Sequence, residues 1–354
     1  MRTADTEQSS LFSTSQTSDF VPDDHPLRRI RSLVDAALDS MQGTLSAAYS
    51  HTGRPGIAPE KLIRALLLQI LYSIRSERQL VEQMRYNMLY RWFVGLSLDD
   101  AVWDATTFTK NRQRFIDGQV TGRLLEAVVE QARQRRLLSE QHFCVDGTLI
   151  EAWASMGSYR RKDDDSEPPS GPPDFQGERR RSDTHECKSD PDARLYKKAE
   201  GQPARLCYIG HVLTDNRHAL VIDAETTRAH GQAEVDAALR LLGRRPGKNR
   251  LTVGADKNYD QRRFVEGARR SRVTPHVAQN TRRRRSCIDR RTTRHSGYDQ
   301  SINVRHRVET PFGWGKFSRP LKKTMLRGLD RVGAQAKLVF TGYNLVRMAA
   351  LEAA

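Results

Sequence analysis

Residues 142–154 read HFCVDGTLIEAWA and residues 251–256 read LTVGAD, and these two stretches decide the fold. Both are short apolar runs with β-branched residues, which is typical of buried strands rather than of helices. Each run carries one aspartate after its apolar residues, Asp146 in the first and Asp256 in the second. We therefore expect both carboxylates to stand at strand ends, along the edge of one sheet.

Similar runs surround these two stretches. Residues 205–214 (RLCYIGHVLT), 218–224 (HALVIDA) and 272–278 (RVTPHVA) are predicted strands, and residues 231–242 (GQAEVDAALRLL) have helical spacing. The resulting order is three strands, a helix, a strand, a helix, a strand and a final helical stretch. This order predicts an α/β fold with an RNase H-like mixed β-sheet flanked by helices.

The chain upstream of residue 136 has a different pattern. Helical spacing and a basic, Thr-capped stretch at residues 104–115 (DATTFTKNRQRF) predict an all-α N-terminal domain at residues 26–135, compatible with DNA binding. Residues 1–25 are predicted to be a disordered tail. Residues 136–350 form the predicted second domain, which contains a flexible insertion at about 157–203 that has almost nothing to bury.

The net charge of +16 is concentrated in one part of the chain. Residues 244–327 hold 24 Lys and Arg against 6 Asp and Glu, whereas the rest of the chain has a net charge of −2. Such a local excess favours a polyanionic partner, DNA or RNA, over a merely solvated basic surface. No apolar run approaches the roughly 20 residues of a membrane span, and the first residues do not read as a secretory signal. We therefore expect a cytoplasmic protein with no membrane contact.

A third carboxylate lies in the basic part of the chain, in residues 301–316 (SINVRHRVETPFGWGK). At about 100° per residue, Arg305, Glu309 and Lys316 share one face of a helix, which Pro311 is expected to kink or restart. A lone aspartate is more often a turn cap, and an acid between two cations also describes a surface helix. The third acid, placed downstream of the two strand aspartates in the most basic segment, instead favours a metal site.

Together these motifs resemble the DDE-type transposases of bacterial insertion sequences, within the RNase H-like integrase superfamily. The resemblance rests on VDGT around Asp146, GADKNYD around Asp256 and the R-x3-E-x6-K pattern, and it is strongest to the insertion sequence four and five group. Residues 54–83 (RPGIAPEKLIRALLLQILYSIRSERQLVEQ) also resemble the helical domain of that group. Two positions depart from its pattern, with Ile302 in place of a frequent Tyr and Asn258 in place of the usual Gly.

The resemblance implies a transposase that cleaves DNA and transfers strands by two-metal phosphodiester chemistry, without a protein nucleophile. Asp146, Asp256 and Glu309 would be catalytic and would bind two Mg²⁺ ions roughly 3.5 to 4 Å apart, with Mn²⁺ able to substitute and Asp146 bridging both. The implied partners are double-stranded DNA, as terminal inverted repeats and target DNA, and a second copy of the chain in a homodimeric synaptic complex. When bound to DNA, the protein would be associated with the bacterial nucleoid.

DNA contacts are expected outside the acidic residues. Arg305 and Lys316 would hold phosphates beside the metal ions, and Lys257 would touch DNA or only shape its turn. Trp314 either stacks on an unpaired base or packs in the core. The remaining candidates form one basic run that follows the DNA backbone, or a disordered loop, and comprise Arg282, Arg283, Arg284 and Arg285.

Two other functions use the same residues. A structure-selective nuclease or resolvase on the same fold would hydrolyse DNA without joining strands. An inactive remnant or repressor would bind DNA without chemistry, although the complete acidic triad argues against it.

Overall fold

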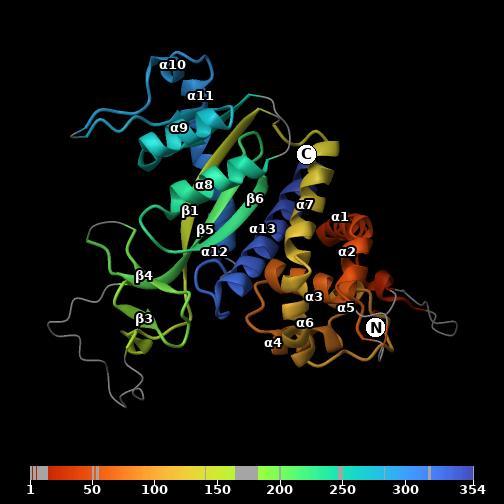
Figure 1. The fold of residues 1–354 in the computed structure, drawn as a ribbon. Helices are drawn as coiled ribbons and strands as arrows, with labels where there is room; N and C mark the ends of the chain where they lie inside the picture. The colour runs from red at the N-terminus through yellow and green to blue at the C-terminus, as the bar shows by residue number, and fades with distance from the viewer. Residues whose placement is uncertain are drawn as a thin grey trace. The chain divides into compact units, whose positions relative to one another are not determined.

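The computed structural model describes residues 2, 5, 15–49, 52, 56–139, 141–163, 182–198, 201–245, 250–282, 284–317 and 320–353. The chain divides into two compact units, whose elements are labelled in Figure 1. Unit 1 consists of residues 1–135 and 337–354, and unit 2 consists of residues 136–336. The sequence placed residues 337–350 in the second domain. The last helix, α13 (Leu329–Leu351), instead continues from unit 2 into unit 1, and Glu352 beyond its end pairs with Arg135 at 2.7 Å.

Unit 1 is helical, as its apolar spacing predicts. Pro59 opens α3 at a position that needs no N–H donor, and the Ser76 side chain accepts a hydrogen bond from Gln79 N to begin α4. Asn87 caps α5 in the same way, and Gly95 ends it in the left-handed region with φ 86°. The α-helices that unit 1 contributes before α13 are α1 (Pro26–Ser40), α2 (Gln42–Ala47), α3 (Pro59–Leu71), α4 (Glu77–Tyr86), α5 (Met88–Val94), α6 (Thr106–Asp117) and α7 (Val120–Gln134).

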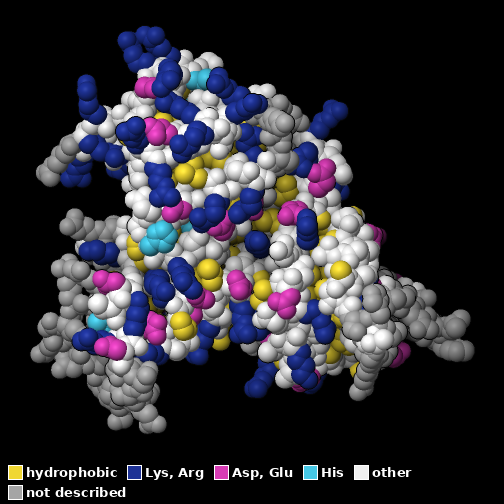
Figure 2. Space-filling view, viewed as in Figure 1, with side chains coloured by type: hydrophobic (Ala, Val, Ile, Leu, Met, Phe, Trp, Pro, Cys, Tyr) yellow, Lys and Arg dark blue, Asp and Glu magenta, His cyan; other side chains and the backbone are white. Residues whose placement is uncertain are grey.

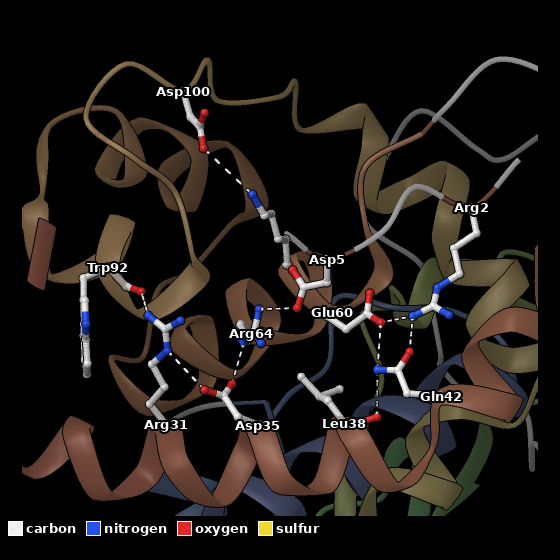
Figure 3. Close-up of polar contacts among 11 residues, drawn as sticks. Arg2, Asp5, Arg31, Asp35, Leu38, Gln42, Glu60, Arg64, Trp92 and Asp100 are labelled. Carbon is white, nitrogen blue, oxygen red and sulfur yellow. Dashed lines mark hydrogen bonds and ion pairs between the residues drawn. The ribbon is translucent and has the colours of Figure 1, made fainter. Parts of the chain in front are cut away.

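A polar network anchors the described N-terminal residues on α3 (Figure 3). The Glu60 side chain is 1% exposed and pairs with Arg2, while Arg64, one turn later, pairs with Asp5 at 2.9 Å. A buried carboxylate needs such a cation, because burying an unpaired charge is costly. Arg2, Asp5 and the short helix η1 (Thr17–Phe20) thus have defined places, although the sequence predicts a disordered tail here. Residues 1, 3, 4 and 6–14 of that tail lie outside the described residues.

Unit 2 is built on a mixed sheet flanked by helices, and the predicted α/β class is confirmed. Within the described residues the strand order is β4-β5-β1-β7-β8, with β4 (Arg194–Tyr196) at one edge and β6 also paired with β5. Strands β6, β5 and β1 are antiparallel to one another in turn, whereas β7 is parallel to β1 and β8 is parallel to β7. The strands are β1 (His142–Glu151), β5 (Arg205–Asp215), β6 (Val221–Arg228), β7 (Leu251–Ala255) and β8 (Val273–Val277).

The insertion that the sequence predicts at about 157–203 is partly structured. β2 (Tyr159–Arg161) pairs with β3 (His185–Cys187), and β4 (Arg194–Tyr196) pairs with β5. Tyr159 is fully buried and stacks on the His185 ring, so this segment does have something to bury. Residues 164–181 and 199–200 of the predicted insertion lie outside the described residues.

Helices cover both faces of the sheet. Val145, Val253 and Ala255 pack with residues of α8 (Ala233–Arg244) and α9 (Arg262–Arg270), and we call this side the α8 face. Alternate residues point the other way. A Cβ on Gly254 would lie 3.0 Å from Cys144 Sγ and 3.6 Å from the Ser301 carbonyl oxygen. This second side is the α11 face, where α11 (Tyr298–Val304) contacts β7 and β8 and η4 (Arg305–Val308) contacts β1; α12 (Glu309–Phe317) follows η4.

Candidate active site

Asp146 lies in the middle of β1, which corrects the expectation that it ends a strand. β5 pairs with β1 along its whole length, from Phe143 to Glu151, and this pairing continues the strand past the aspartate. β7 pairs only with residues 142–144. Asp146 therefore stands just beyond the last residue that β7 covers. Residues 145–150 are the open edge of β1, which ends where Glu151 N donates to the Lys322 carbonyl oxygen at 3.1 Å.

Asp256 follows β7 directly. It comes two residues after Gly254, which is in register with Cys144, just as Asp146 comes two residues after Cys144. Neighbouring strands lie about 4.8 Å apart and side chains alternate, so both aspartates belong to the α11 face at equivalent positions. Asp256 also caps η3 (Lys257–Tyr259), because its carboxylate accepts from Asn258 N at 2.8 Å and from Asn258 Nδ2 at 3.2 Å. Asp256 can therefore cap a turn and also belong to a metal site.

The electrostatic environment couples the two aspartates. Burial raises the pKa of Asp146, and the negative charge of Asp256 raises it further. A hydrogen bond from Gly147 N at 2.7 Å and the charges of Lys198 and Arg305 lower the same pKa. Two carboxylates held this way repel each other, and an additional cation would relieve that repulsion.

The third motif folds as three elements rather than one helix. α11 ends at Val304, Arg305 begins the 3-10 helix η4, and α12 starts at Glu309. Pro311 falls in the first turn of α12, where a missing N–H costs nothing, so it restarts the helix as expected. The fully buried Val308 anchors η4 in unit 2. Arg305 consequently does not share an α-helical face with Glu309, which corrects the prediction from a continuous period.

Glu309 and Lys316 do share a face of α12, since seven residues make about two turns, or roughly 10 Å. Lys316 is partly buried, and while burial and Lys198 lower its pKa, the nearby charge of Asp146 raises it. Glu309 is exposed at the first position of the helix. In the described residues no three His, Cys, Asp or Glu side chains are placed to hold a metal ion together. The structure thus brings Asp146, Asp256, Arg305 and Lys316 close, and leaves Glu309 outside this group.

Two protein-family models match the chain. A model described as Transposase DDE domain matches residues 138–345, more than half of the chain, and a model described as Transposase domain (DUF772) matches residues 15–114. The chain belongs to the DDE transposase family. This transposase is therefore a DNA endonuclease and strand transferase, and its family uses divalent metal ions.

Solved structures similar to the transposase are distant. A piggyBac transposase synaptic complex with hairpin DNA has 8% identity and a TM-score of 0.42, covering 93% of this chain and 76% of that one. A Mos1 transposase paired-end complex with left transposon end has 11% identity and a TM-score of 0.21, covering 84% and 98%. Neither likeness adds to the family assignment. No curated protein matches the transposase. Among its described helices, none is long and apolar enough to cross a membrane.

The donor groups of the transposase fit a divalent cation. Asp146 and Asp256 present two carboxylates at the open edge of β1, beside the backbone carbonyl of Gly147. Hard cations such as Mg²⁺ take oxygen donors of these two kinds. Burial raises the pKa of Asp146 and the charge of Asp256 raises it further, and a bound cation would offset both penalties on the ionised carboxylate.

The expected DNA contacts of the transposase lie largely on its surface. Lys257 is exposed on η3, whereas Trp314 on α12 is partly buried. In the basic run, Arg282, Arg284 and Arg285 are exposed, and Arg283 lies outside the described residues. Figure 2 shows Lys and Arg side chains gathered over the part of unit 2 that contains α9 and α10 (Arg290–Thr293).

Asp260 has a structural role that the sequence did not reveal. Its fully buried carboxylate accepts from Asn280 N at 2.7 Å and from Cys287 N at 2.8 Å, and its carbonyl oxygen accepts from Arg284. These bonds hold both ends of residues 280–287, which we call the arginine loop. The only signal in the sequence was an acid beside the buried Tyr259, at the end of the second aspartate motif.

Glu234 is a second residue that the sequence analysis missed. It lies in the first turn of α8, where an acid is unremarkable because it favours the helix dipole. Burial raises the pKa of Glu234 to about 7, and the charges of Asp146 and Asp256 add to this effect while Lys198 opposes it. Glu234 is therefore electrostatically coupled to both aspartates, although about 90 residues of sequence separate it from Asp146.

Proposed function

We propose that this transposase cuts and joins the ends of its own insertion sequence with two Mg²⁺ ions, for which Mn²⁺ can substitute. The observation that supports this best is the equivalent placement of Asp146 and Asp256 on the parallel strands β1 and β7. Asp146 would hold both ions in this proposal, and Asp256 would hold one of them. When bound, such ions activate an attacking water or 3′-hydroxyl at neutral pH and stabilise the leaving oxygen of an in-line displacement.

Glu309 completes the acidic set in this proposal by moving towards the aspartates when metal and DNA bind. Two features of the transposase support the movement. Glu309 starts α12 directly after the short 3-10 helix η4, so its position depends on a brief non-α segment. It also shares a helix face with Lys316, whose pKa already responds to Asp146.

Cationic side chains bind the DNA backbone in the proposed complex. Arg305 and Lys316 hold phosphates beside the metal site, with Arg offering a bidentate fork and Lys a point charge. The arginine loop and Lys257 follow the duplex outside the site, and Trp314 stacks on a base that is unpaired at the cut.

The proposed partners follow from the reaction. Joining requires double-stranded DNA of two kinds, the terminal inverted repeats and the target. Two ends must meet in one complex, so we propose a homodimer in the synaptic complex, associated with the bacterial nucleoid while it is bound to DNA.

The test incubates the protein with Mg²⁺, labelled element ends and a target plasmid. Asp146→Asn should reduce both cleavage and joining to the level seen with EDTA, because the amide cannot hold the ions. Asp299→Asn, an exposed aspartate of α11, serves as the matched control and should behave as the wild type. Cleavage without joining by the wild type would instead support a nuclease or resolvase, and full activity of Asp146→Asn would reject the proposal.

A further inference from the structure

Gly147, next to Asp146, lies against a side chain of α8. A Cβ at this position would lie 3.1 Å from both Cγ and Oε1 of Glu234 and 3.1 Å from Nδ1 of His211. Glycine in a strand permits such a close approach, whereas any other residue would push the helix side chain away. The Glu234 carboxylate therefore lies directly over the backbone that follows Asp146.

His211 marks the same spot from the neighbouring strand. It is paired with Gly147 in the register of β5 on β1, and its side chain is 1% exposed. Its Nε2 lies 2.8 Å from Thr227 Oγ1, but its Nδ1 has no hydrogen-bond partner within the described part of the chain. A buried polar atom without a partner costs about 1–3 kcal/mol. A ligand bound beside Glu234 would supply that partner.

A cation from the chain itself already stands at this place. Lys198 Nζ donates to the Gly147 carbonyl oxygen at 3.2 Å, and its charge lowers the pKa of both Asp146 and Glu234. The ammonium group thus hydrogen-bonds to a backbone carbonyl oxygen, and its charge acts on two carboxylates without forming an ion pair to either in the described residues. Divalent cations such as Mg²⁺ and Mn²⁺ prefer this kind of oxygen donor set.

The other acids on this side of the sheet are already neutralised. Glu225 pairs with Arg240 at 2.5 Å and with Arg244 at 2.7 Å, and Asp223 pairs with Arg244 at 2.9 Å. By contrast, the Glu234 side chain makes no hydrogen bond or ion pair in the described residues, although burial raises its pKa to about 7. No contact within the described part of unit 2 therefore accounts for placing a carboxylate near Asp146 and Asp256.

We propose that Glu234 is a further carboxylate ligand of the divalent-metal site, binding metal together with Asp146, and that Lys198 holds this position in the metal-free chain. The inference rests on the proposed metal-dependent function. The open edge of β1 makes the geometry possible, because in the described part of the chain β7 pairs with β1 only as far as Cys144. Asp146 and Glu234 would hold the ion in place of the Lys198 ammonium group, and their oxygens would have to move closer together, because the described residues do not place three such donors around one point.

Metal binding without DNA tests the assignment. Mn²⁺ is titrated into the full-length protein, and the free aqua ion is measured by electron paramagnetic resonance. Glu234→Gln should weaken Mn²⁺ binding by about tenfold or more, as removal of metal-site partners does. Glu266→Gln, the same change at an exposed residue of α9 that pairs only with Arg262, is the matched control and should bind as the wild type.

Three further variants and one control test the geometry. Gly147→Ala should also weaken Mn²⁺ binding, because its methyl group displaces Glu234, whereas Gly243→Ala, which meets nothing within 4 Å, should not. Gly147→Ala combined with Glu234→Gln should lose little more than either change alone, since both act on one contact. Lys198→Gln should bind Mn²⁺ more tightly, because a competing cation is removed.

The outcomes separate the inference from the proposed function. If Asp146→Asn loses Mn²⁺ and Glu234→Gln keeps wild-type affinity, the metal site stands and the assignment of Glu234 is overturned. If both keep wild-type affinity, the proposed metal site falls as well. Unfolding temperatures in EDTA identify a merely structural role, in which Glu234→Gln would be less stable without metal yet gain as much stability from Mn²⁺ as the wild type. Unchanged or weaker Mn²⁺ binding by Lys198→Gln would overturn the assignment of Lys198.

Discussion

Single residues in this chain serve the fold and the site at once. Asp256 caps η3 through Asn258, and the same hydrogen bonds orient the carboxylate that we assign to the metal. Asn258 stands where the sequence resemblance leads one to expect Gly, and its side-chain amide adds a second hydrogen bond to the carboxylate. A departure from the family pattern can therefore strengthen the position of a ligand.

His276 gives a prediction for the dependence of stability on pH. It is fully buried on β8, with Nδ1 2.7 Å from Ser301 Oγ, and burial followed by the charges of His295 and His142 lowers its pKa to about 4. In the unfolded chain its pKa is about 6.5. The folded state thus resists protonation, so the stabilising contribution is complete above pH 6.5 and is lost as the pH falls from 6.5 to 4.

The loss from this one group should be about 3 kcal/mol in the free energy of unfolding. His276→Asn keeps a polar group near the Nδ1 position but does not titrate, so its stability should fall less over the same interval. Urea unfolding at pH 7, 6, 5 and 4 measures the difference. His306→Asn, at an exposed position, should follow the wild type, and parallel pH profiles for His276→Asn and wild type would contradict the prediction.

Sequence alone could locate Asp146 and Asp256, because isolated acids in apolar runs stand out locally. It could not assign Glu234 or Asp260. Glu234 is one of several acids in a helical first turn, and its significance comes from contact with Gly147, which lies far away in the sequence. Asp260 depends in the same way on backbone groups of residues 280 and 287.

At the level of elements, residues 301–316 show where periodicity reaches its limit. A uniform 100° period places three charged residues on one face, but the buried Val308 and the proline at 311 favour a 3-10 segment between two helices. Packing of η4 against β1 therefore overrides the local pattern. The strands were better predicted, since β-branched runs between turn residues have few alternatives.

The arginine loop provides a prediction at this scale. Asp260→Asn replaces one acceptor oxygen by a donor that faces a backbone N–H, so we expect a loss of about 2 kcal/mol in stability. The loop should also become more accessible to trypsin at Arg282, Arg284 and Arg285. Limited proteolysis with mass spectrometry reads out the cleavage sites. Asp299→Asn controls for the change of charge, and wild-type protease resistance of Asp260→Asn would show that other contacts fix the loop.

For the whole molecule, the uneven charge makes a prediction about DNA affinity. Replacing Arg282, Arg284 and Arg285 by Gln should weaken binding to any duplex and make it less sensitive to salt. The slope of log affinity against log salt should fall by about 0.9 for each phosphate contact removed. Fluorescence anisotropy at several salt concentrations measures it.

The control is a triple Gln variant of arginines that already face carboxylates, namely Arg205, Arg228 and Arg240. Its salt slope should stay near the wild-type value. Equal slopes for the two triple variants would mean that the arginine loop does not contact phosphates. A net charge counted from the sequence does not distinguish arginines that pair with carboxylates from arginines that do not. This comparison therefore also tests how well such a count locates a DNA-binding surface.

The course of α13 has a consequence for biosynthesis. Residues 337–354 belong to the same compact unit as residues 1–135, and the whole of unit 2 lies between them in the chain. A ribosome must therefore translate the catalytic segment before the earliest helices can acquire their last partner. Domains usually fold in the order in which they emerge. Here unit 1 can be completed only after residues 337–354 have been synthesised. A chain that ends before these residues would lack part of unit 1.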